Sequence, residues 1–367
     1  MKKILYGVCG IGNGHTQRQL PLIEYFSKKN KIVIFAYDTS FDFYLDYFKD
    51  NPLVTVLEVA VPFYVGDKDG IDLEATKNLP SNKKDYDAIN GKAMAAAEKI
   101  IGTPDVVITD YEPVSAQYAY KHQAPLITID QQSKYLAGKF PSELHGQTYA
   151  DEVARLKMFF PTAIVRIACS FFDVTRKKDG ENVLMVPPII KSSILYMKNS
   201  PEEPASILVY FSSQRELQQN LDDVAFILSE IPEVQFHIFA SSIDNQNEYK
   251  NVHFYKHGDN RFGEVLRKCS GIVSTAGHTL LSEAMYLGIP VYAIPFPLYE
   301  QQMNAEVVHK NMFGIRSETI NKRDLENFIK NIPQYRDSIK RDKKILLRGS
   351  GEQKIITVVE DILHLEK

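Results

Sequence analysis

The chain has 367 residues, of which 44% are hydrophobic, and a formal net charge of −3 at pH 7. A chain of this size can bury a large core, and its length predicts two domains. The charge disfavours a nucleic-acid partner, because a duplex-binding protein usually carries a basic stripe.

The compartment is suggested by the cysteines and by the hydropathy. Cys9, Cys169 and Cys269 are widely spaced and form no CxxC pair, which predicts buried free thiols and a reducing cytoplasm. The N-terminus runs directly into a strand without a signal peptide, and no apolar run is long enough to span a bilayer. We therefore expect a cytoplasmic protein with at most peripheral contact at the inner membrane face.

The first predicted unit is a buried strand at residues 4–9, a glycine-rich loop at 10–15 and a helix. Pro21 disfavours a regular helix, so the regular part is predicted to begin no earlier than Arg18. A second strand at 32–37 ends at Asp38. This order resembles a dinucleotide fingerprint, but the third glycine comes one residue early and is followed by His15, which argues against a nicotinamide site.

Gly14 and His15 close this loop at the start of the helix. A helix N-terminus disfavours the imidazolium form, so His15 is a candidate general base near neutral pH. The alternative is that His15 only caps the loop by hydrogen bonding.

Residues 54–62 predict a third strand, and residues 88–101 predict an alanine-rich helix. The polar, acidic segment 64–86 between them is predicted to be a mobile loop that can touch an acceptor. It resembles a calcium loop, but a full ligand set and a closing glutamate are not in register, so we assign no metal.

Residues 104–110 predict a strand that ends in Asp110 at the same sheet edge as His15, followed by a helix at 112–122. A carboxylate on one imidazole nitrogen fixes the tautomer, so that the other nitrogen can accept a proton. Two alternatives stay open: Asp110 can cap the following helix, and Glu112 can be the base instead of His15.

Further strands are predicted at 125–130, 164–170 and 183–190. The apolar run 157–161 lies beside Arg155 and is interpreted as core packing rather than a membrane patch. Residues 198–204, KNSPEEP, form the best linker. The predicted units are therefore a first domain at 1–198, a second at 205–348, and a terminal helix at 349–367.

The second half predicts strands at 207–211, 234–240 and 252–255 and helices at 214–231, 322–331, 334–347 and 354–365. Within it, residues 271–305 predict a strand, a turn at Gly277, a helix from His278, a stop at Gly288 and a strand at 291–296. The free N–H groups at such a helix start, near Gly277, His278 and Thr279, suit a phosphate.

Three polar side chains in this segment are candidate hydroxyl readers. Glu283 lies too deep in the helix to cap it, so its carboxylate can bind ribose hydroxyls, although it can also be an ordinary surface glutamate. Glu300 and Gln301 follow the next strand in a predicted loop at the same end of the sheet. An anion site with several hydroxyl readers is typical of a nucleotide-sugar site.

This segment resembles the donor-binding region of GT-B glycosyltransferases, both the UDP-GlcNAc transferase that makes lipid II and the small-molecule UDP-sugar transferases. The matching residues are Gly277, the pair Glu283-Ala284, Gly288 with Pro290, and Glu300-Gln301 followed by Asn304-Ala305. The fit is close over residues 251–314 and looser elsewhere. The chain has no tryptophan, so a tryptophan-stacked uracil is excluded.

The resemblance implies specific roles. Glu283 would hold the ribose, Glu300 and Gln301 the sugar hydroxyls, and Ser213 the donor phosphates. Gly14 would be part of the donor-binding site, and His15 beside it would be the general base, oriented by Asp110. Main-chain groups of the loop at 256–262 would bind the uracil of the donor.

We therefore expect an α/β protein with two Rossmann-like domains facing across a cleft, the GT-B fold. The expected activity is inverting transfer from a UDP-sugar to a hydroxyl acceptor, without cofactor or metal. The acceptor is a sugar, a lipid-linked glycan or a small molecule, in cell-surface glycan or glycolipid synthesis by analogy. The alternatives are a UDP-sugar epimerase of the same fold and a non-catalytic nucleotide-sugar-binding protein.

Overall fold

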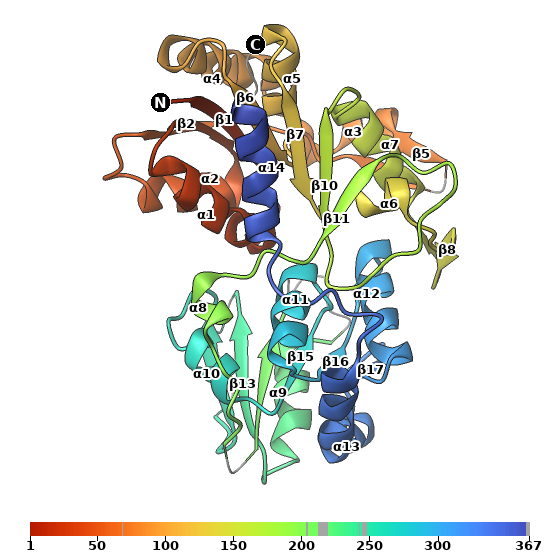
Figure 1. Ribbon diagram of the computed structural model, residues 1–367. Coiled ribbons are helices and arrows are strands. Elements are labelled where there is room, and N and C mark those ends of the chain that lie inside the picture. The colour runs from red at the N-terminus through yellow and green to blue at the C-terminus, as the bar shows by residue number, and fades with distance from the viewer. Residues whose placement is uncertain (68, 203–204, 212–218, 242, 244–247, 365–367) are drawn as a thin grey trace.

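The protein is built on two parallel β-sheets, one above the other in Figure 1. The structure is a computed structural model that describes residues 1–67, 69–202, 205–211, 219–241, 243 and 248–364. The upper sheet has the strand order β11-β10-β7-β6-β1-β2-β3, and the lower has β14-β13-β12-β15-β16-β17. All pairings within both sheets are parallel.

The strands of the two sheets match most of the predicted runs. The upper sheet contains β1 (Lys3–Val8), β2 (Lys31–Ala36), β3 (Val54–Glu58), β6 (Val106–Asp110), β7 (Leu126–Asp130), β10 (Val165–Cys169) and β11 (Val183–Val186). The lower sheet contains β12 (Ser206–Tyr210), β13 (Gln235–Ala240), β14 (Val252–Lys256), β15 (Gly271–Ser274), β16 (Val291–Ala293) and β17 (Gly314–Arg316). The central strands, such as β1 and β12, are almost entirely apolar because helices cover both faces of each sheet.

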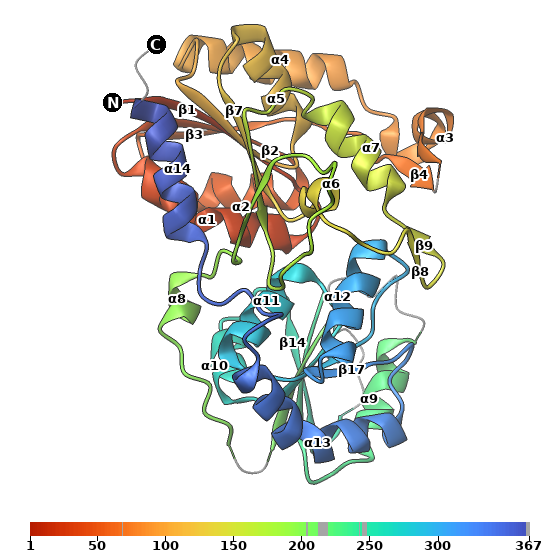
Figure 2. The same ribbon diagram turned by 45° about the vertical axis from the view of Figure 1, so that its right-hand side comes forward.

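Helices cover the faces of both sheets, as Figures 1 and 2 show. In the first half they are α1 (Asn13–Ser27), α2 (Asp38–Tyr47), α4 (Tyr86–Ile100), α5 (Pro113–His122), α6 (Lys134–Ala137), α7 (Ala150–Phe159) and α8 (Ser192–Leu195). In the second half they are α9 (Leu221–Ser229), α10 (Phe262–Lys268), α11 (His278–Leu287), α12 (Tyr299–Lys310), α13 (Lys322–Arg341) and α14 (Glu352–His364).

The start of the first helix was predicted wrongly. Helix α1 begins at Asn13 and continues through Pro21, so His15 lies in its first turn. Pro21 removes one backbone donor and would normally break the helix. The helix is tied down ahead of the proline, because the Tyr44 hydroxyl donates to the Thr16 carbonyl at 2.7 Å.

The segment 64–86 is not a plain loop. It contains an antiparallel hairpin of β4 (Val65–Asp67) and β5 (Gly70–Asp72), helix α3 (Leu73–Asn78) and a short 3₁₀ turn (Pro80–Asn82). The side chain of Asp72 accepts a hydrogen bond from Ala75 N and caps α3. The acidic residues that resemble a calcium loop thus include a helix cap.

Three further expectations are corrected in the second half. One helix, α13, runs from Lys322 to Arg341 with Pro333 inside it, where two helices were predicted. The helix predicted from residue 214 begins, in its described part, at Leu221 with Asn220 as its cap. Glu300 and Gln301 lie in the first turn of α12 and not in a loop.

The run at 157–161 is buried only in part. Phe159 and Phe160 are buried, whereas Met158 is 44% exposed. Core packing is therefore confirmed for Phe159 and Phe160 only, because Lys157, Met158 and Pro161 are exposed. No described helix combines the length and the hydropathy that crossing a bilayer requires.

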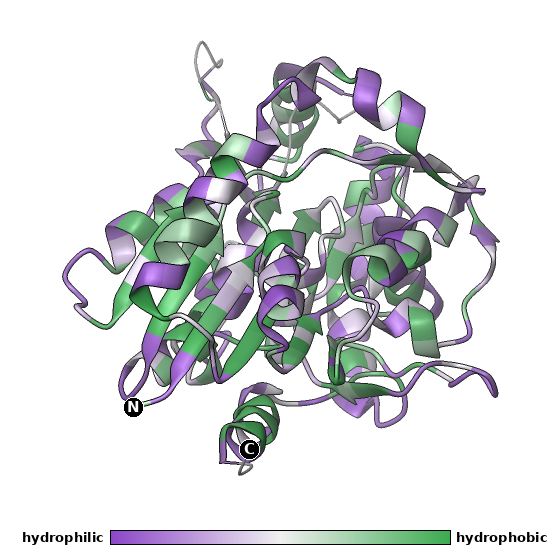
Figure 3. Cartoon of the chain, turned by 90° about the horizontal axis from the view of Figure 1, so that it is seen from above, coloured by the Kyte–Doolittle hydropathy of each residue, from purple (hydrophilic) through white to green (hydrophobic). Residues whose placement is uncertain are grey.

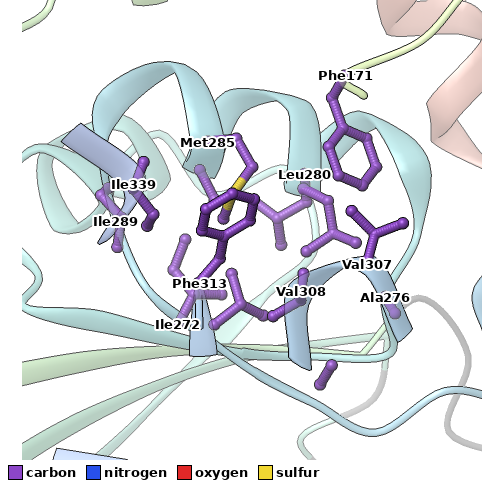
Figure 4. Packing of buried hydrophobic residues seen from close by; sticks show 14 of the residues in the cluster. Phe171, Ile272, Ala276, Leu280, Met285, Ile289, Val307, Val308, Phe313 and Ile339 are labelled. Atoms are coloured by element: carbon purple, nitrogen blue, oxygen red, sulfur yellow. The ribbon is translucent and has the colours of Figure 1, made fainter. Parts of the chain in front are cut away.

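Two apolar clusters link distant parts of the chain. In one, Phe171, which follows β10, packs with Leu280 of α11 and Val307 of α12 (Figure 4). In the other, Ile355 and Val359 of α14 join the core beneath the upper sheet. Figure 3 shows the apolar side of α14, and Figure 1 shows that this last helix runs beside the first part of the chain.

Candidate active site

The candidate site residues follow the strands at which each sheet reverses its order. In the upper sheet this reversal lies between β1 and β6, and in the lower sheet between β12 and β15. Ligands of open α/β sheets bind beyond the carboxyl ends of strands at such a switch point. His15 follows β1 and Asp110 ends β6, while Gly277 and His278 follow β15.

The two switch points meet in space. The Thr279 hydroxyl at the start of α11 donates to the Gly14 carbonyl at 3.3 Å. A Cβ atom added to Gly14 would lie 3.2 Å from the Thr279 hydroxyl oxygen, so a side chain at Gly14 would crowd this contact. Gly14 therefore allows the helix starts of the two halves to approach each other.

His15 and Asp110 form a buried pair. Nδ1 of His15 lies 3.0 Å from Oδ1 of Asp110, and the side chains are 15% and 0% exposed. Asp110 also accepts hydrogen bonds from Arg18 Nη2, at 2.9 and 2.8 Å, and from Gln19 Nε2 at 2.8 Å. The predicted neighbours are thus brought together, with two additional donors on the carboxylate.

The charges around this pair act in opposite directions. Burial lowers the pKa of His15, the Cys9 sulfur and the Asp110 carboxylate raise it, Arg18 lowers it, and the net shift is upward to about 10. Burial raises the pKa of Asp110, but Arg18 and His15 together outweigh burial. The net shift is downward, so Asp110 stays ionised. The sequence predicted a neutral His15 at the helix start, whereas the Cys9 sulfur and the Asp110 carboxylate outweigh burial and favour the imidazolium.

Glu112 has a structural position. It is the N-cap of α5, and its two carboxylate oxygens accept hydrogen bonds from Val114 N and Ser115 N, both at 2.7 Å. Burial raises the pKa of Glu112 to about 7, against the lowering effect of these amide bonds. Glu112, and not Asp110, caps the helix. The Asp110 carboxylate instead contacts His15 and Arg18.

The start of α11 differs in one detail from the prediction. Ala276 has the positive φ of 60°, whereas Gly277 has an ordinary extended backbone with φ −64° and ψ 139°. No atom lies within 4 Å of a Cβ added to Gly277, so there is open space beside this turn. The N–H groups in the first turn of α11 have no partner within the helix, and such groups can bind an anion.

His278 is buried where the two halves meet. Its side chain is 5% exposed, and its ring centroid lies 5.8 Å from that of Phe171. Burial lowers the pKa of His278 well below its usual value, and Lys134 and Arg18 lower it further. His278 is therefore a neutral imidazole beneath the start of α11.

Glu283 is on the same helix and is also buried, at 5% exposed. Burial raises the pKa of its carboxyl group, and Lys191 lowers it. Burial raises the pKa of Tyr210, which ends β12, and the Glu283 carboxylate also raises it. Glu283 is thus not an ordinary surface glutamate, because it lies inside the molecule near the end of a strand at the switch point.

Glu300 and Gln301 lie at the start of α12. Asn304 joins this turn to the preceding one, since its Nδ2 donates to Glu300 Oε1 at 3.3 Å and to the Ala276 carbonyl at 3.0 Å. Gln301 Oε1 accepts a hydrogen bond from Phe296 N at 2.9 Å. Glu300 is therefore tied to the α11 turn, and the Gln301 oxygen is already engaged.

Two basic residues at the site were missed by the sequence interpretation. Arg18 is one helical turn after His15 and is 4% exposed. Lys134 is fully buried after β7; burial lowers its pKa to about 8, while Glu300 raises it. Their spacing from His15 and from a strand end was a usable signal, because a basic residue in an otherwise buried segment needs a carboxylate nearby.

Two expectations concern other parts of the site. Ser213, predicted to contact the donor phosphates, lies outside the described residues. Among the residues that are described, no group of three or more histidine, cysteine, aspartate or glutamate side chains is arranged to hold a metal ion.

Known proteins were compared with this chain at the level of sequence and of structure. A family model described as glycosyl transferase family 1 matches residues 2–333. No curated protein sequence matches. The fold is similar to that of many solved structures, of which three are described here.

LpCGTa in complex with UDP has a TM-score of 0.67 and 13% identity and covers 100% of both chains. A UDP-glucosyltransferase from Polygonum tinctorium has a TM-score of 0.65 and 13% identity, and the match covers 100% of this chain and 99% of that one. UGT89C1 of Arabidopsis thaliana, complexed with UDP-L-rhamnose, has a TM-score of 0.62 and 11% identity, and the match covers 99% of each chain. At these identities the likeness shows the fold, two Rossmann-like domains in the GT-B arrangement. Because the family model spans most of the sequence, the chain belongs to glycosyl transferase family 1 and is a glycosyltransferase.

Proposed function

We propose that this protein is an inverting glycosyltransferase that moves a sugar from a UDP-sugar to an acceptor hydroxyl. The observation that carries the proposal is the His15–Asp110 pair, at 3.0 Å, beside the start of α11, where Thr279 contacts Gly14. This geometry supports the proposal, because a one-step displacement requires a base close to the diphosphate site.

On the donor side, the N–H groups around Gly277, His278 and Thr279 bind the diphosphate and offset the charge that grows on departing UDP. Ser213 is a further proposed phosphate ligand. Glu283 accepts hydrogen bonds from the ribose hydroxyls. Buried carboxylates are effective at this, because a hydrogen bond to a charged acceptor is stronger than a neutral one.

The sugar lies next to the ribose and diphosphate, with Glu300 and Gln301 at its hydroxyls. Support comes from Asn304, which joins Glu300 to the Ala276 carbonyl and so fixes the distance between the two turns. Since the Gln301 oxygen already accepts from Phe296 N, its amide N–H₂ group is the part that can donate to the sugar.

In the proposed reaction, the acceptor oxygen attacks the anomeric carbon from the face opposite UDP. The bond from that carbon to the UDP oxygen breaks, and the acceptor's proton passes to Nε2 of His15. Asp110 keeps Nδ1–H of His15 in place and stabilises the imidazolium that forms. The configuration at the anomeric carbon is inverted because there is one displacement.

The proposed acceptor is a hydroxyl on a sugar, a lipid-linked glycan or a small molecule, and the proposed setting is cell-surface glycan or glycolipid synthesis in the cytoplasm, with at most peripheral membrane contact. The buried free thiols Cys9, Cys169 and Cys269 support a reducing compartment. We take 1–198, 205–348 and 349–367 as the units of the chain.

The test is to incubate the protein separately with UDP-GlcNAc, UDP-glucose and UDP-galactose and to follow UDP and the sugar by mass spectrometry. A transferase releases UDP slowly even when water is the acceptor, and faster once a suitable hydroxyl compound is supplied from a panel. UDP release that is lost in the His15→Ala variant supports the proposal.

Other results contradict it. Interconversion of the UDP-sugars without UDP release would identify an epimerase. A rise in melting temperature with every UDP-sugar, but no turnover with any acceptor of the panel, would identify a binding protein. No thermal shift and no turnover would remove the donor assignment itself.

A further inference from the structure

Arg18 is the only described side chain that contacts both members of the His15–Asp110 pair by hydrogen-bond distances. Its Nη2 lies 2.9 and 2.8 Å from the two Asp110 oxygens and 2.9 Å from His15 Nδ1. The side chain is 4% exposed, and its Nε atom has no partner among the described residues. A guanidinium is buried in this way only where a carboxylate compensates for the loss of water.

The contact with Nδ1 matters because that nitrogen can serve only one partner at a time. If Nδ1 carries hydrogen, it donates to Asp110 and leaves Nε2 with a lone pair. If Arg18 donates to Nδ1 instead, the neutral ring carries its hydrogen on Nε2 and cannot take a proton there. In the active arrangement, Nη2 therefore gives its hydrogens to the two Asp110 oxygens.

Arg18 also sets the balance of charge at His15. From the surrounding elements, Cys9 after β1 and Asp110 on β6 favour the imidazolium, while burial and Arg18 oppose it. Tyr111 contributes a stacked ring at 6.4 Å, and His278 from α11 is neutral. Arg18 lies on the same helix as His15, and its positive charge opposes the effect of Cys9 and Asp110 from the neighbouring elements.

We propose that Arg18 is a positioning residue for glycosyl transfer: it neutralises Asp110 and holds both carboxylate oxygens, so that His15 can lose its Nε2 proton and keep Nδ1–H toward Asp110. This inference rests on the proposed function for its catalytic meaning. Its structural content, the effect of Arg18 on the proton of His15, stands apart from any substrate.

Gln19 provides a matched comparison. Its Nε2 donates to the same carboxylate, Asp110, at 2.8 Å, and to the Ile129 carbonyl at 2.9 Å, and its Oε1 accepts from Tyr6 at 2.6 Å. Gln19 therefore supplies a hydrogen bond to Asp110 without a charge. A variant at Gln19 separates loss of a hydrogen bond from loss of the cation.

The experiment is an NMR titration of the full chain labelled with ¹⁵N-histidine, in which the His15 signals are identified by their loss in His15→Gln. The ¹⁵N shifts report both the pKa and the tautomer. Once His15 of the wild-type protein is deprotonated, we expect the neutral ring to carry its hydrogen on Nδ1. Arg18→Gln should raise its pKa by about 1 or more, because an uncompensated carboxylate favours imidazolium. Gln19→Met should change it by less than half of that.

The Arg18→Lys variant retains the charge and should bring the pKa of His15 back towards the wild-type value. If Arg18→Gln does not fold, this variant carries the test, and a departure from wild type as large as about 1 would overturn the charge argument. An unchanged pKa in folded Arg18→Gln, or a wild-type neutral ring with hydrogen on Nε2, would also overturn it.

The titration uses no donor or acceptor, so its outcome is separate from that of the UDP-release assay. Where turnover is measured, Arg18→Gln should move the rising limb of the kcat/KM profile to higher pH by the same amount as the pKa of His15. A fall in activity that is equal at every pH would show a purely structural role and contradict the proposal.

Discussion

At the scale of single residues, the site consists of polar groups that burial would penalise if each stood alone. Asp110, Arg18 and His15 satisfy one another within 3.0 Å, and Glu283 is buried as a carboxyl group whose pKa is raised. Groups with such perturbed pKa values cluster at functional sites. The individual roles can therefore be separated by substitutions that leave the backbone unchanged.

The first prediction concerns His15. His15→Ala should lower turnover by about 10²–10⁴-fold, the usual contribution of a general base, and leave the affinity for UDP almost unchanged. Because the pKa of His15 is raised to about 10 and the base form is the deprotonated one, wild-type activity should rise with pH from neutrality towards 10.

The measurement is UDP release across this pH range, with binding of UDP by calorimetry. The exposed His364 on α14, changed to alanine, is the control and should behave as wild type. A large loss of UDP binding in His15→Ala would move His15 from the reaction to the donor site.

The second prediction concerns Glu283. Glu283→Ala should weaken UDP binding by about 10- to 100-fold, because hydrogen bonds to a charged group contribute about 1.5–3 kcal/mol. Calorimetry with UDP measures this directly. Glu326→Ala, which changes an exposed glutamate on α13, is the matched control. Unchanged affinity in Glu283→Ala would rule out the ribose contact.

The third prediction separates Glu112 from the base. Since both oxygens of Glu112 cap α5, Glu112→Gln should lower the melting temperature through a weakened cap, worth about 0.5–2 kcal/mol. Turnover per folded molecule should stay within a few-fold of wild type. A loss comparable to that of His15→Ala would return Glu112 to the reaction.

At the scale of elements, strand runs and the β15–α11 turn were predictable because they depend on local apolar runs and on glycine. Gly288, for example, ends α11 in the left-handed region with φ 73°. The failures occurred where tertiary contacts override a local rule. Pro21 and Pro333 remain inside helices, and residues 64–86 fold as a hairpin and short helices.

The site was predictable to a similar degree. Strand ends placed His15 and Asp110 at the upper switch point and α11, which carries Glu283, at the lower one. Arg18 was missed although its position one helical turn after His15 was a signal that could have been used. Assignment of Glu300 to a loop failed because α12 begins directly after an exposed turn at Leu298. A helix start without a side-chain cap leaves no sequence signal.

The fourth prediction concerns close backbone contact at the loop before His15. A Cβ atom added to Gly10 would lie 1.9 Å from the Tyr37 carbonyl oxygen. Gly10→Ala should therefore cost about 1–3 kcal/mol and displace the loop, so that melting temperature and turnover fall together.

The control is Gly91→Ala in the exposed middle of α4, where a Cβ would meet nothing within 4 Å. It should stabilise the protein by about 0.8–1 kcal/mol, the difference in helix propensity. Thermal melting of both variants measures the effect. Equal stability of Gly10→Ala and wild type would show that the loop is not constrained as described.

At the scale of the whole molecule, apolar contacts connect the halves of the chain in addition to the Thr279–Gly14 hydrogen bond: Phe171 packs on α11 and α12, and α14 packs beside α1. Tyr25 of α1 donates a hydrogen bond to Glu360 of α14 at 2.8 Å. The relative position of His15 and α11 therefore depends on these apolar contacts as well as on the hydrogen bond between Thr279 and Gly14.

The fifth prediction tests the second contact. Ile355 is fully buried, so Ile355→Ala should destabilise the part of the protein around α1 by about 2–5 kcal/mol. Thr357→Ala, on the exposed side of the same helix, should have little effect. Calorimetric melting distinguishes them, and equal melting curves would mean that α14 is not needed for the first half to be stable.

The central claim is that UDP binds where the starts of α11 and α12 meet the start of α1, which carries His15. A crystal structure of the protein with UDP tests it most directly. The account predicts the diphosphate on the N–H groups near Gly277–Thr279, the ribose hydroxyls on the Glu283 carboxylate, and Glu300 on the side where the sugar would continue. UDP bound elsewhere, or with Glu283 turned away from the ribose, would contradict it.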